Sequence, residues 1–248
     1  MDPADHLTCL RADVARVAGA VRAGRDRPVA SCPGWTVADL AVHLGIVHRW
    51  ANEAISTNAT ERPRHAKERY GVPADTPDLA EWYEDAAATL LDTLFTADPE
   101  SPVWTFGQDP TVRFWIRRQA NEVLVHRWDA QTAVDAGAVD PIDPEHAADA
   151  VDELLLSLLP SRTQPPADGG LRTFHLHRTD GPGEWFVTVD ADGYRAERAH
   201  EKGDIAVRGS AAGLVLFVWH RSTADLEVFG DADADAASDA WFAVVPAF

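Results

Sequence analysis

The chain has little cysteine, and it lacks both a long apolar run and a signal-peptide pattern. Only two cysteines occur in 248 residues, Cys9 and Cys32, so neither a disulfide framework nor a CxxC metal pair can form. We therefore expect a reducing compartment, the cytoplasm. The N-terminus lacks the basic-then-apolar order of an export signal. The longest apolar run of the C-terminal half, residues 213–219, is far shorter than the roughly 20 residues that cross a bilayer.

Basic residues are also scarce. The chain has 22 lysines and arginines against 40 acidic residues, which gives a net charge of -18 at pH 7. A field of this sign repels phosphate backbones and anionic lipid headgroups, so we expect neither nucleic acid nor a membrane as partner. With 46% apolar and 25% charged residues, the rest of the composition is that of a globular protein. The length suits one large domain or two modest ones.

The first 160 residues have the periodicity of helices. Apolar side chains recur at three- and four-residue steps over residues 4–23, which indicates an amphipathic helix. A break follows at the Cys-Pro-Gly-Trp segment, residues 32–35. The second helix is expected to begin at Thr36, because Asp39 stands three residues later in a capping-box pattern.

Three further helices are predicted before residue 160. The polar residues 57–74 are expected to form a surface loop, and the Thr-Pro pair at residues 76–77 is expected to begin the third helix. The fourth helix is predicted over residues 112–136, where a glycine follows. A fifth is predicted from residue 143 to about residue 159.

The pattern changes at residues 161–170, which are rich in proline, glycine and polar residues. We therefore predict a domain boundary there, between residues 1–160 and a smaller domain of residues 161–248. Short alternating runs separated by turns predict an antiparallel sheet in the smaller domain. Two helices are expected to accompany it, over residues 210–219 and 234–244.

The sharpest chemical signal lies on the fourth predicted helix. Glu122 and His126 are four residues apart, so their side chains project from one helix face, one turn apart. A carboxylate and an imidazole in a bundle interior are costly unless they are paired or bind a cation. The spacing thus indicates a divalent-metal site, although a surface ion pair has the same spacing. Asp129 continues this face, either as acceptor for a ligand's ring N–H or as an exposed residue.

The second predicted helix offers two histidines as a third ligand. His43 and His48 lie roughly 140° apart around the helix, so both cannot aim at one centre. Their spacing slightly favours His43 without excluding His48. Two histidines and one glutamate form a catalytic type of zinc site, with one position left open. The same donors also accept Ni²⁺ and other divalent ions.

Two segments of the chain carry a family resemblance. The first is SCPGWTVADLAVHL at residues 31–44, and the second is EVLVHRWDA at residues 122–130. Together they resemble the mycothiol-dependent maleylpyruvate isomerase family, part of the wider DinB-like group of metal-binding helix bundles. The resemblance implies an α+β fold, with an N-terminal DinB-like four-helix bundle followed by a smaller, sterol-carrier-like α/β domain.

The resemblance also implies a site and a reaction. Zinc would be bound by His43, Glu122 and His126, with mycothiol as a low-molecular-weight thiol cosubstrate. Arg221 resembles the family's arginine that faces the active site and would hold a carboxylate of a small-molecule substrate. An arginine after a helix also complements the helix dipole, so this second reading stays open. The implied activity is cis–trans isomerisation, or thiol transfer, through a metal-bound thiolate.

Two other functions are compatible with the same residues. A metal-dependent hydrolase would use zinc-bound hydroxide. A non-catalytic protein would bind a lipid-like small molecule and keep the metal as a structural ion. Structural zinc is normally closed by four protein ligands, and three candidates favour an open site. We expect Cys32 to be structural, and His175 and His177 to be surface residues rather than a second metal site.

Overall fold

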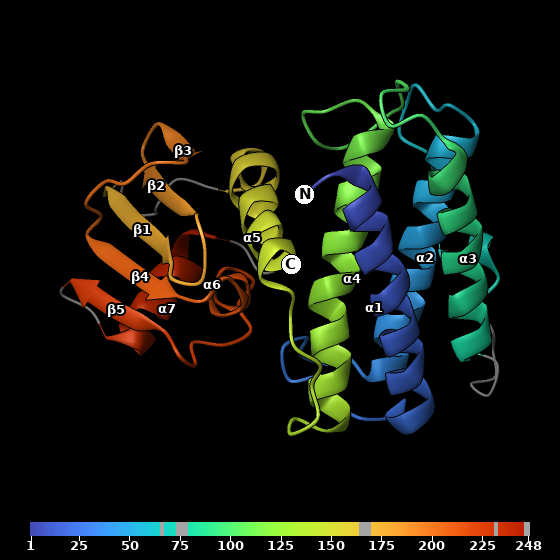
Figure 1. Cartoon of the computed structure of the whole chain (residues 1–248), viewed down its shortest axis with the longest axis horizontal. Helices are drawn as coiled ribbons and strands as arrows, with labels where there is room; N and C mark the ends of the chain where they lie inside the picture. Colours follow the sequence, from blue (N-terminus) through green and yellow to red (C-terminus); the bar gives the residue numbers. More distant parts are fainter. Residues whose placement is uncertain (65–66, 73–78, 164–169, 231–232, 246–248) are drawn as a thin grey trace. The chain divides into compact units, whose positions relative to one another are not determined.

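The computed structural model describes residues 1–64, 67–72, 79–163, 170–230 and 233–245. The chain divides into two units, Met1–Pro141 and Ile142–Phe248, which are coloured blue to green and yellow to red in Figure 1. Among the described residues, no helix combines the length and the apolar character that a membrane span needs.

Four long helices form the first unit. They are α1 (Pro3–Gly24), α2 (Val37–Ser56), α3 (Leu79–Thr96) and α4 (Val112–Val134), and a short 3-10 helix, η1 (Lys67–Tyr70), lies between α2 and α3. The four run alongside one another as a bundle (Figure 1), as the resemblance implied. Their apolar stripes meet inside the bundle because only that arrangement removes them all from water.

The helix ends follow local sequence signals. Thr36 caps α2, and the backbone N–H of Thr36 donates in return to Asp39 Oδ2 at 2.9 Å, which confirms the predicted capping box. α4 begins at Val112 as predicted but ends two residues early, because Asp135 has an extended backbone. The predicted start of the third helix at residues 76–77 lies outside the described residues.

Aromatic side chains fill one part of the bundle core. Trp115 is fully buried, and its indole N–H donates to the carbonyl oxygen of Trp104 at 2.9 Å. Trp50 meets Trp115 edge-to-face, with ring centroids 5.3 Å apart, and stacks on Phe106 at 6.0 Å. These contacts fix how α2 lies against α4, the helix that carries Glu122 and His126.

The second unit begins with α5 (Pro144–Glu153). Asp143 caps this helix, and Pro144 occupies its first turn, where a missing N–H costs nothing. A π-helical turn, η3 (Leu154–Leu158), and a 3-10 turn, η4 (Leu159–Ser161), extend it to the predicted length.

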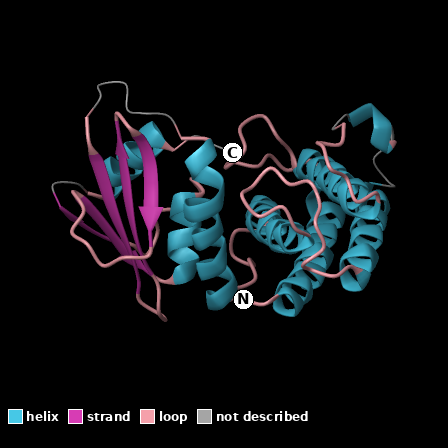
Figure 2. Cartoon of the chain, turned by 90° about the horizontal axis from the view of Figure 1, so that it is seen from above, coloured by secondary structure: helices cyan, strands magenta, loops and turns pink. Residues whose placement is uncertain are grey.

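A five-stranded sheet follows, shown in magenta in Figure 2. Its strand order is β3-β2-β1-β4-β5. Three of the four pairings between these described strands are antiparallel, but β1 and β4 run parallel, so the prediction of an antiparallel sheet was wrong at this pair. The connection between them passes through β2 and β3, and alternation of side chains does not encode strand direction. The strands are β1 (Arg172–Arg178), β2 (Glu184–Asp190), β3 (Gly193–Glu197), β4 (Ile205–Gly209) and β5 (Glu227–Gly230).

Helices cover one face of this sheet. Phe174 of β1 packs edge-to-face on Trp241 of α7 (Ala234–Val244), with ring centroids 5.1 Å apart. The indole N–H of Trp185 in β2 donates to Asp152 of α5 at 3.1 Å. Trp241 also contacts Phe217 of α6 (Ala211–Val218). The chain is therefore an α+β protein, as expected.

Candidate metal centre

Helix α4 carries three ionisable side chains in one row. Arg118, Glu122 and His126 follow one another at four-residue steps, which places them along a single helix face. Arg118 is only 3% exposed and His126 only 8%. The row therefore faces the protein interior, and the Glu122–His126 pair is not a surface ion pair.

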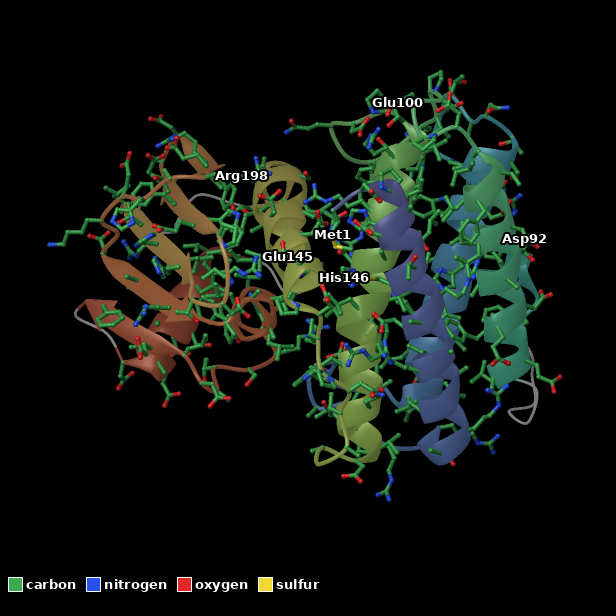
Figure 3. The ribbon with its side chains drawn as sticks, viewed as in Figure 1. Met1, Asp92, Glu100, Glu145, His146 and Arg198 are labelled. Atoms are coloured by element: carbon green, nitrogen blue, oxygen red, sulfur yellow. The ribbon has the colours of Figure 1, made fainter. Side chains whose placement is uncertain are left out.

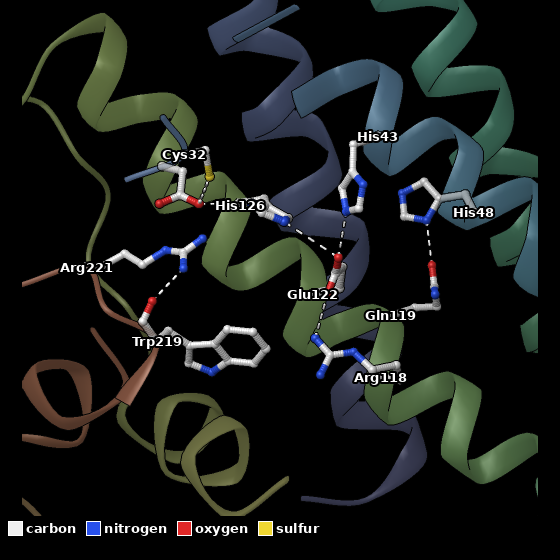
Figure 4. Close-up of polar contacts among 10 residues, drawn as sticks. Cys32, His43, His48, Arg118, Gln119, Glu122, His126, Trp219 and Arg221 are labelled. Atoms are coloured by element: carbon white, nitrogen blue, oxygen red, sulfur yellow. Dashed lines mark hydrogen bonds and ion pairs between the residues drawn. The ribbon is translucent and has the colours of Figure 1, made fainter. Parts of the chain in front are cut away.

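His43 of α2 meets this row (Figure 4). Its Nε2 lies 2.9 Å from Oε1 of Glu122, and Nε2 of His126 lies 3.6 Å from the same oxygen. The two imidazole rings meet edge-to-face, with centroids 5.2 Å apart. One ligand atom from each residue lies within 4.8 Å of the other two. Ligand atoms on a tetrahedral zinc with bonds of about 2.0–2.1 Å are roughly 3.3 Å apart, so small side-chain shifts would suffice.

Asp129 sets the orientation of His126. Its Oδ2 lies 2.9 Å from Nδ1 of His126, and its Oδ1 accepts a hydrogen bond of 2.6 Å from the Ser31 hydroxyl. Since a carboxylate only accepts, the proton resides on Nδ1, and Nε2 is directed to Glu122. Asp129 is 1% exposed. Of the two roles that the sequence left open, the structure shows the acceptor of a ring N–H.

The Cys32 thiol lies beside the same carboxylate. Its Sγ is 3.9 Å from Oδ2 of Asp129, within the wider limit for sulfur hydrogen bonds. Cys32, His126 and Asp129 also form a group of ligand-type atoms within 4.8 Å. Because Asp129 is already engaged by His126, we regard Cys32 as part of the surroundings of the His126 ring.

The charge of Glu122 is held by its neighbours. Burial by itself would raise the pKa of Glu122, but the Arg118 guanidinium and the hydrogen bonds of His126 and His43 hold that pKa well below its ordinary value. Arg118 lies 2.8 Å from Oε2, while Oε1 is directed to the two histidines. The carboxylate is therefore ionised, with Oε2 held by Arg118 and Oε1 shared by the two histidines.

The charge of His126 follows from the same cluster. Burial by itself would lower the pKa of His126, but the hydrogen bonds to Asp129, Cys32 and Glu122 raise it well above its ordinary value. The ring is therefore protonated on Nε2 as well as on Nδ1. A cation that binds Nε2 must displace the Nε2 proton, so binding would release protons to solvent.

His48 lies elsewhere in the bundle. Its Nδ1 is 2.7 Å from Oε1 of Gln119, and its ring is 5.6 Å from the ring of Tyr83. Burial lowers the pKa of His48 to about 4, so the ring is neutral at pH 7. The structure thus brings His43, and not His48, to Glu122 and His126.

Arg221 belongs to the second unit, where it follows α6. Its backbone N–H donates to Leu216 and that of His220 donates to Phe217, a Schellman-type helix end in which His220 has a φ of 62°. The Arg221 guanidinium donates to the carbonyl oxygen of Trp219. This contact places positive charge at the carbonyl end of α6, as the helix-dipole reading expected. The role of Arg221 toward a substrate stays a prediction.

Two residues of this site, Arg118 and Ser31, were not predicted from the sequence. Arg118 precedes Glu122 by four residues, so the spacing that revealed His126 could also have revealed it. Ser31 gave a weaker signal. Two successive turns bring Ser31 to α4. In the first, the backbone N–H of Cys32 donates to the Val29 carbonyl oxygen, and in the second, the backbone N–H of Trp35 donates to the Cys32 carbonyl oxygen.

The two histidines of the first strand differ in exposure. His177 is half-buried, but His175 is only 9% exposed, so the expectation of a surface residue was wrong for His175. Residues 198–204, which follow β3, cover His175. Alternation along β1 gives no indication of this cover.

Comparisons with known proteins identify both units. The model of the mycothiol maleylpyruvate isomerase N-terminal domain matches residues 7–131, and the model of the MDMPI C-terminal domain matches residues 145–237. Among curated proteins, no significant match to the chain is found.

Solved structures resemble the chain in fold. A histidine-to-alanine mutant of the mycothiol-dependent maleylpyruvate isomerase is 15% identical, with a TM-score of 0.67, and the mycothiol-dependent maleylpyruvate isomerase is 16% identical, with a TM-score of 0.65. Each match covers 94% of this chain and 96% of the other. At this identity the likeness concerns the fold alone. Since the two domain models match in order along most of the chain, the protein belongs to the mycothiol maleylpyruvate isomerase family.

Proposed function

We propose that this protein is a mycothiol-dependent isomerase of the maleylpyruvate isomerase type, which uses a divalent cation bound by His43, Glu122 and His126. The observation that carries the proposal is the convergence of two imidazole nitrogens and one carboxylate oxygen, from two helices, within 4.8 Å. Family membership supports the reaction class.

The chemistry of the donors suits zinc or nickel. Imidazole nitrogen and carboxylate oxygen bind both ions well. Asp129 holds the proton of His126 on Nδ1, which directs Nε2 inward. Arg118 occupies Oε2 of Glu122 and leaves Oε1 for a cation. Three protein ligands leave one coordination position open, which favours catalysis over a purely structural metal.

The reaction needs an activated sulfur and a substrate that can rotate about one bond. A bound cation would lower the pKa of a coordinated thiol, so that the sulfur binds as thiolate. The mycothiol sulfur would add reversibly to the substrate double bond, which becomes a rotatable single bond, and would leave again after rotation. The chain's own residues hold the site: Asp129 orients His126, and Arg118 orients Glu122. We assign to Arg221 the task of holding a substrate carboxylate.

The test measures conversion of maleylpyruvate to fumarylpyruvate by purified chain after chelation. Four samples are compared, with and without mycothiol and with and without added Zn²⁺. We expect turnover only when both are present, with the free thiol recovered at the end. Hydrolytic cleavage of the substrate without thiol would instead favour the hydrolase, and consumption of the thiol would favour transfer.

Two variants connect this activity to the site. His126→Ala should lose both the bound cation and the turnover, because Nε2 is one of three ligand atoms. His48→Asn is the matched control. His48 is buried in the same bundle, but its Nδ1 bonds Gln119 rather than a residue of the proposed metal site. Unchanged metal content in His126→Ala would contradict the ligand assignment.

A further inference from the structure

The sheet of the second unit brings together a second set of histidines. His175 and His177 alternate along β1, so they share the sheet face opposite Phe174 and its helices. Glu184 of β2 lies directly across from His177 in the strand register. Cross-strand partners have their Cβ atoms about 5 Å apart and project from the same face. Two imidazoles and a carboxylate therefore meet on this face through strand pairing alone.

A third imidazole reaches the same carboxylate. Nε2 of His175 lies 2.9 Å from Oε2 of Glu184, and Nδ1 of His177 lies 3.3 Å from Oε1. Nδ1 of His200 also bonds Oε2. The ring of His175 is 5.2 Å from that of His200 and 5.9 Å from that of His177. One ligand atom from each of the four residues lies within 4.8 Å of all the others.

The segment that carries His200 is attached to the fold at both ends. Arg198 makes two hydrogen bonds to the carboxylate of Asp152, at 2.7 and 2.6 Å, and it is labelled in Figure 3. At the other end, the Thr173 hydroxyl donates to Asp204 at 2.6 Å, and the backbone N–H of Asp204 donates to Thr173 at 2.8 Å. These contacts hold residues 198–204 over β1 independently of the histidines.

Gly203 allows this segment to lie close to the strand. A Cβ atom at position 203 would lie 2.8 Å from the backbone nitrogen of His175, closer than real Cβ contacts come. A surface hollow of about 510 Å³ borders the cluster and is lined by His175, His200 and the segment around Gly203. Solvent ions can therefore reach the cluster, although His175 is buried.

The three imidazoles converge on one carboxylate. His175 and His200 both direct a ring nitrogen at Oε2 of Glu184, and His177 directs one at Oε1. Each neutral imidazole also carries a lone pair, which a cation between the rings would use. A cation would bind all four groups without requiring any histidine to be protonated. The chain's net charge of -18 favours cations at its surface.

We propose that four side chains of the second unit form a site for one divalent cation of zinc type, closed by four protein ligands: His175, His177, Glu184 and His200. Four protein ligands leave no position for a substrate, so the role is structural. The cation fastens residues 198–204 to β1 and β2. This site is separate from the three-ligand cluster of the bundle, and neither proposal depends on the other.

The test is the Zn²⁺ stoichiometry of the full chain after chelation, measured by titration calorimetry and metal analysis. We expect two equivalents for the unaltered chain, one for Glu184→Gln, one for His126→Ala and none for the double variant. Glu227→Gln is the matched control, because Glu227 is a glutamate of the same sheet that pairs with Arg208 instead. It should bind as the unaltered chain does.

The outcomes separate the two sites. If Glu184→Gln lowers the number of Zn²⁺ equivalents by one, either in the unaltered chain or in His126→Ala, the sheet site is supported. This result supports the sheet site even if the bundle site binds no ion. Stoichiometry unchanged by both Glu184→Gln and His177→Gln overturns it. The second variant keeps the test valid if the first does not fold.

Trypsin gives an independent readout of the structural role. Lys202 is exposed within the segment that carries His200, which is itself 78% exposed in its side chain. We expect Zn²⁺ to slow tryptic cleavage after Lys202 in the unaltered chain and in Glu227→Gln, but not in Glu184→Gln. Cleavage at the same rate with and without Zn²⁺ in the unaltered chain would contradict the fastening role.

Discussion

Nδ1 of His126 and Oδ2 of Asp129 lie 2.9 Å apart in the interior of the bundle. This contact directs the other ring nitrogen to Glu122, so Asp129→Asn should weaken Zn²⁺ binding about 10- to 100-fold. Asparagine keeps the size but can turn a donor toward the ring. Competition with a chelator of known affinity measures the change. Ser31→Ala removes only a partner of Asp129 and should have a smaller effect; equal affinity in Asp129→Asn and the unaltered chain would refute the orienting role.

The ion pair between Arg118 and Glu122 makes a prediction about stability. Arg118→Met keeps much of the side-chain volume but leaves a largely buried carboxylate without its cationic partner, which should cost about 3 kcal/mol in free energy of unfolding. Bound Zn²⁺ supplies positive charge, so the loss should be smaller in the loaded protein. Urea unfolding with and without Zn²⁺ measures both values. An equal loss in the two conditions would show that the cation does not contact Glu122.

His48 should make stability depend on pH. Its pKa is about 4 in the folded protein against 6.5 ordinarily, so below pH 6.5 the unfolded chain takes up a proton that the folded chain does not. Stability from this group is therefore lost as pH falls from 6.5 toward 4. Between pH 7 and 4.5, His48→Asn should lose about 2–3 kcal/mol less than the unaltered chain in urea unfolding. Parallel pH profiles would contradict a neutral buried His48.

Gly45 allows Trp82 to pack against α2. A Cβ atom at position 45 would lie 2.2 Å from the Trp82 ring, so Gly45→Ala should lower the free energy of unfolding by about 1 kcal/mol, after helix propensity offsets part of the overpacking. Gly19 of α1 has no atom within 4 Å of the same position. Gly19→Ala should therefore raise the free energy of unfolding by about 0.5–1 kcal/mol. Denaturant midpoints that shift equally for both variants would disprove the close approach.

Substitution of Arg221 distinguishes a contact with the substrate from a contact with the end of α6. Lysine keeps the charge but loses the bidentate geometry, so Arg221→Lys should raise KM for maleylpyruvate about 10- to 100-fold with Zn²⁺ content unchanged. Steady-state kinetics at saturating mycothiol measures this. Arg208→Lys, at an arginine that pairs with Glu227 on the sheet, should leave KM unchanged. If both variants keep the original KM, Arg221 acts only on the carbonyl end of α6.

Local sequence determined much of the fold. The capping box of Thr36 and Asp39 sets where α2 begins, and the four-residue step from Glu122 to His126 places both side chains on one face of α4. These features depend on residues at most four positions apart, so helix geometry alone relates them. The family resemblance added the bundle and the sheet domain, which the domain matches and the fold confirm.

The tertiary structure decided which distant residues meet. His43 rather than His48 lies beside Glu122, 79 positions away, because the packing of α2 on α4 sets which side of α2 faces the row. Ser31 reaches Asp129 across 98 positions, and β1 pairs in parallel with β4. Periodicity reports only which side of an element is apolar. Which element packs against that apolar side, and the angle between the two elements, follow from packing the whole unit without voids.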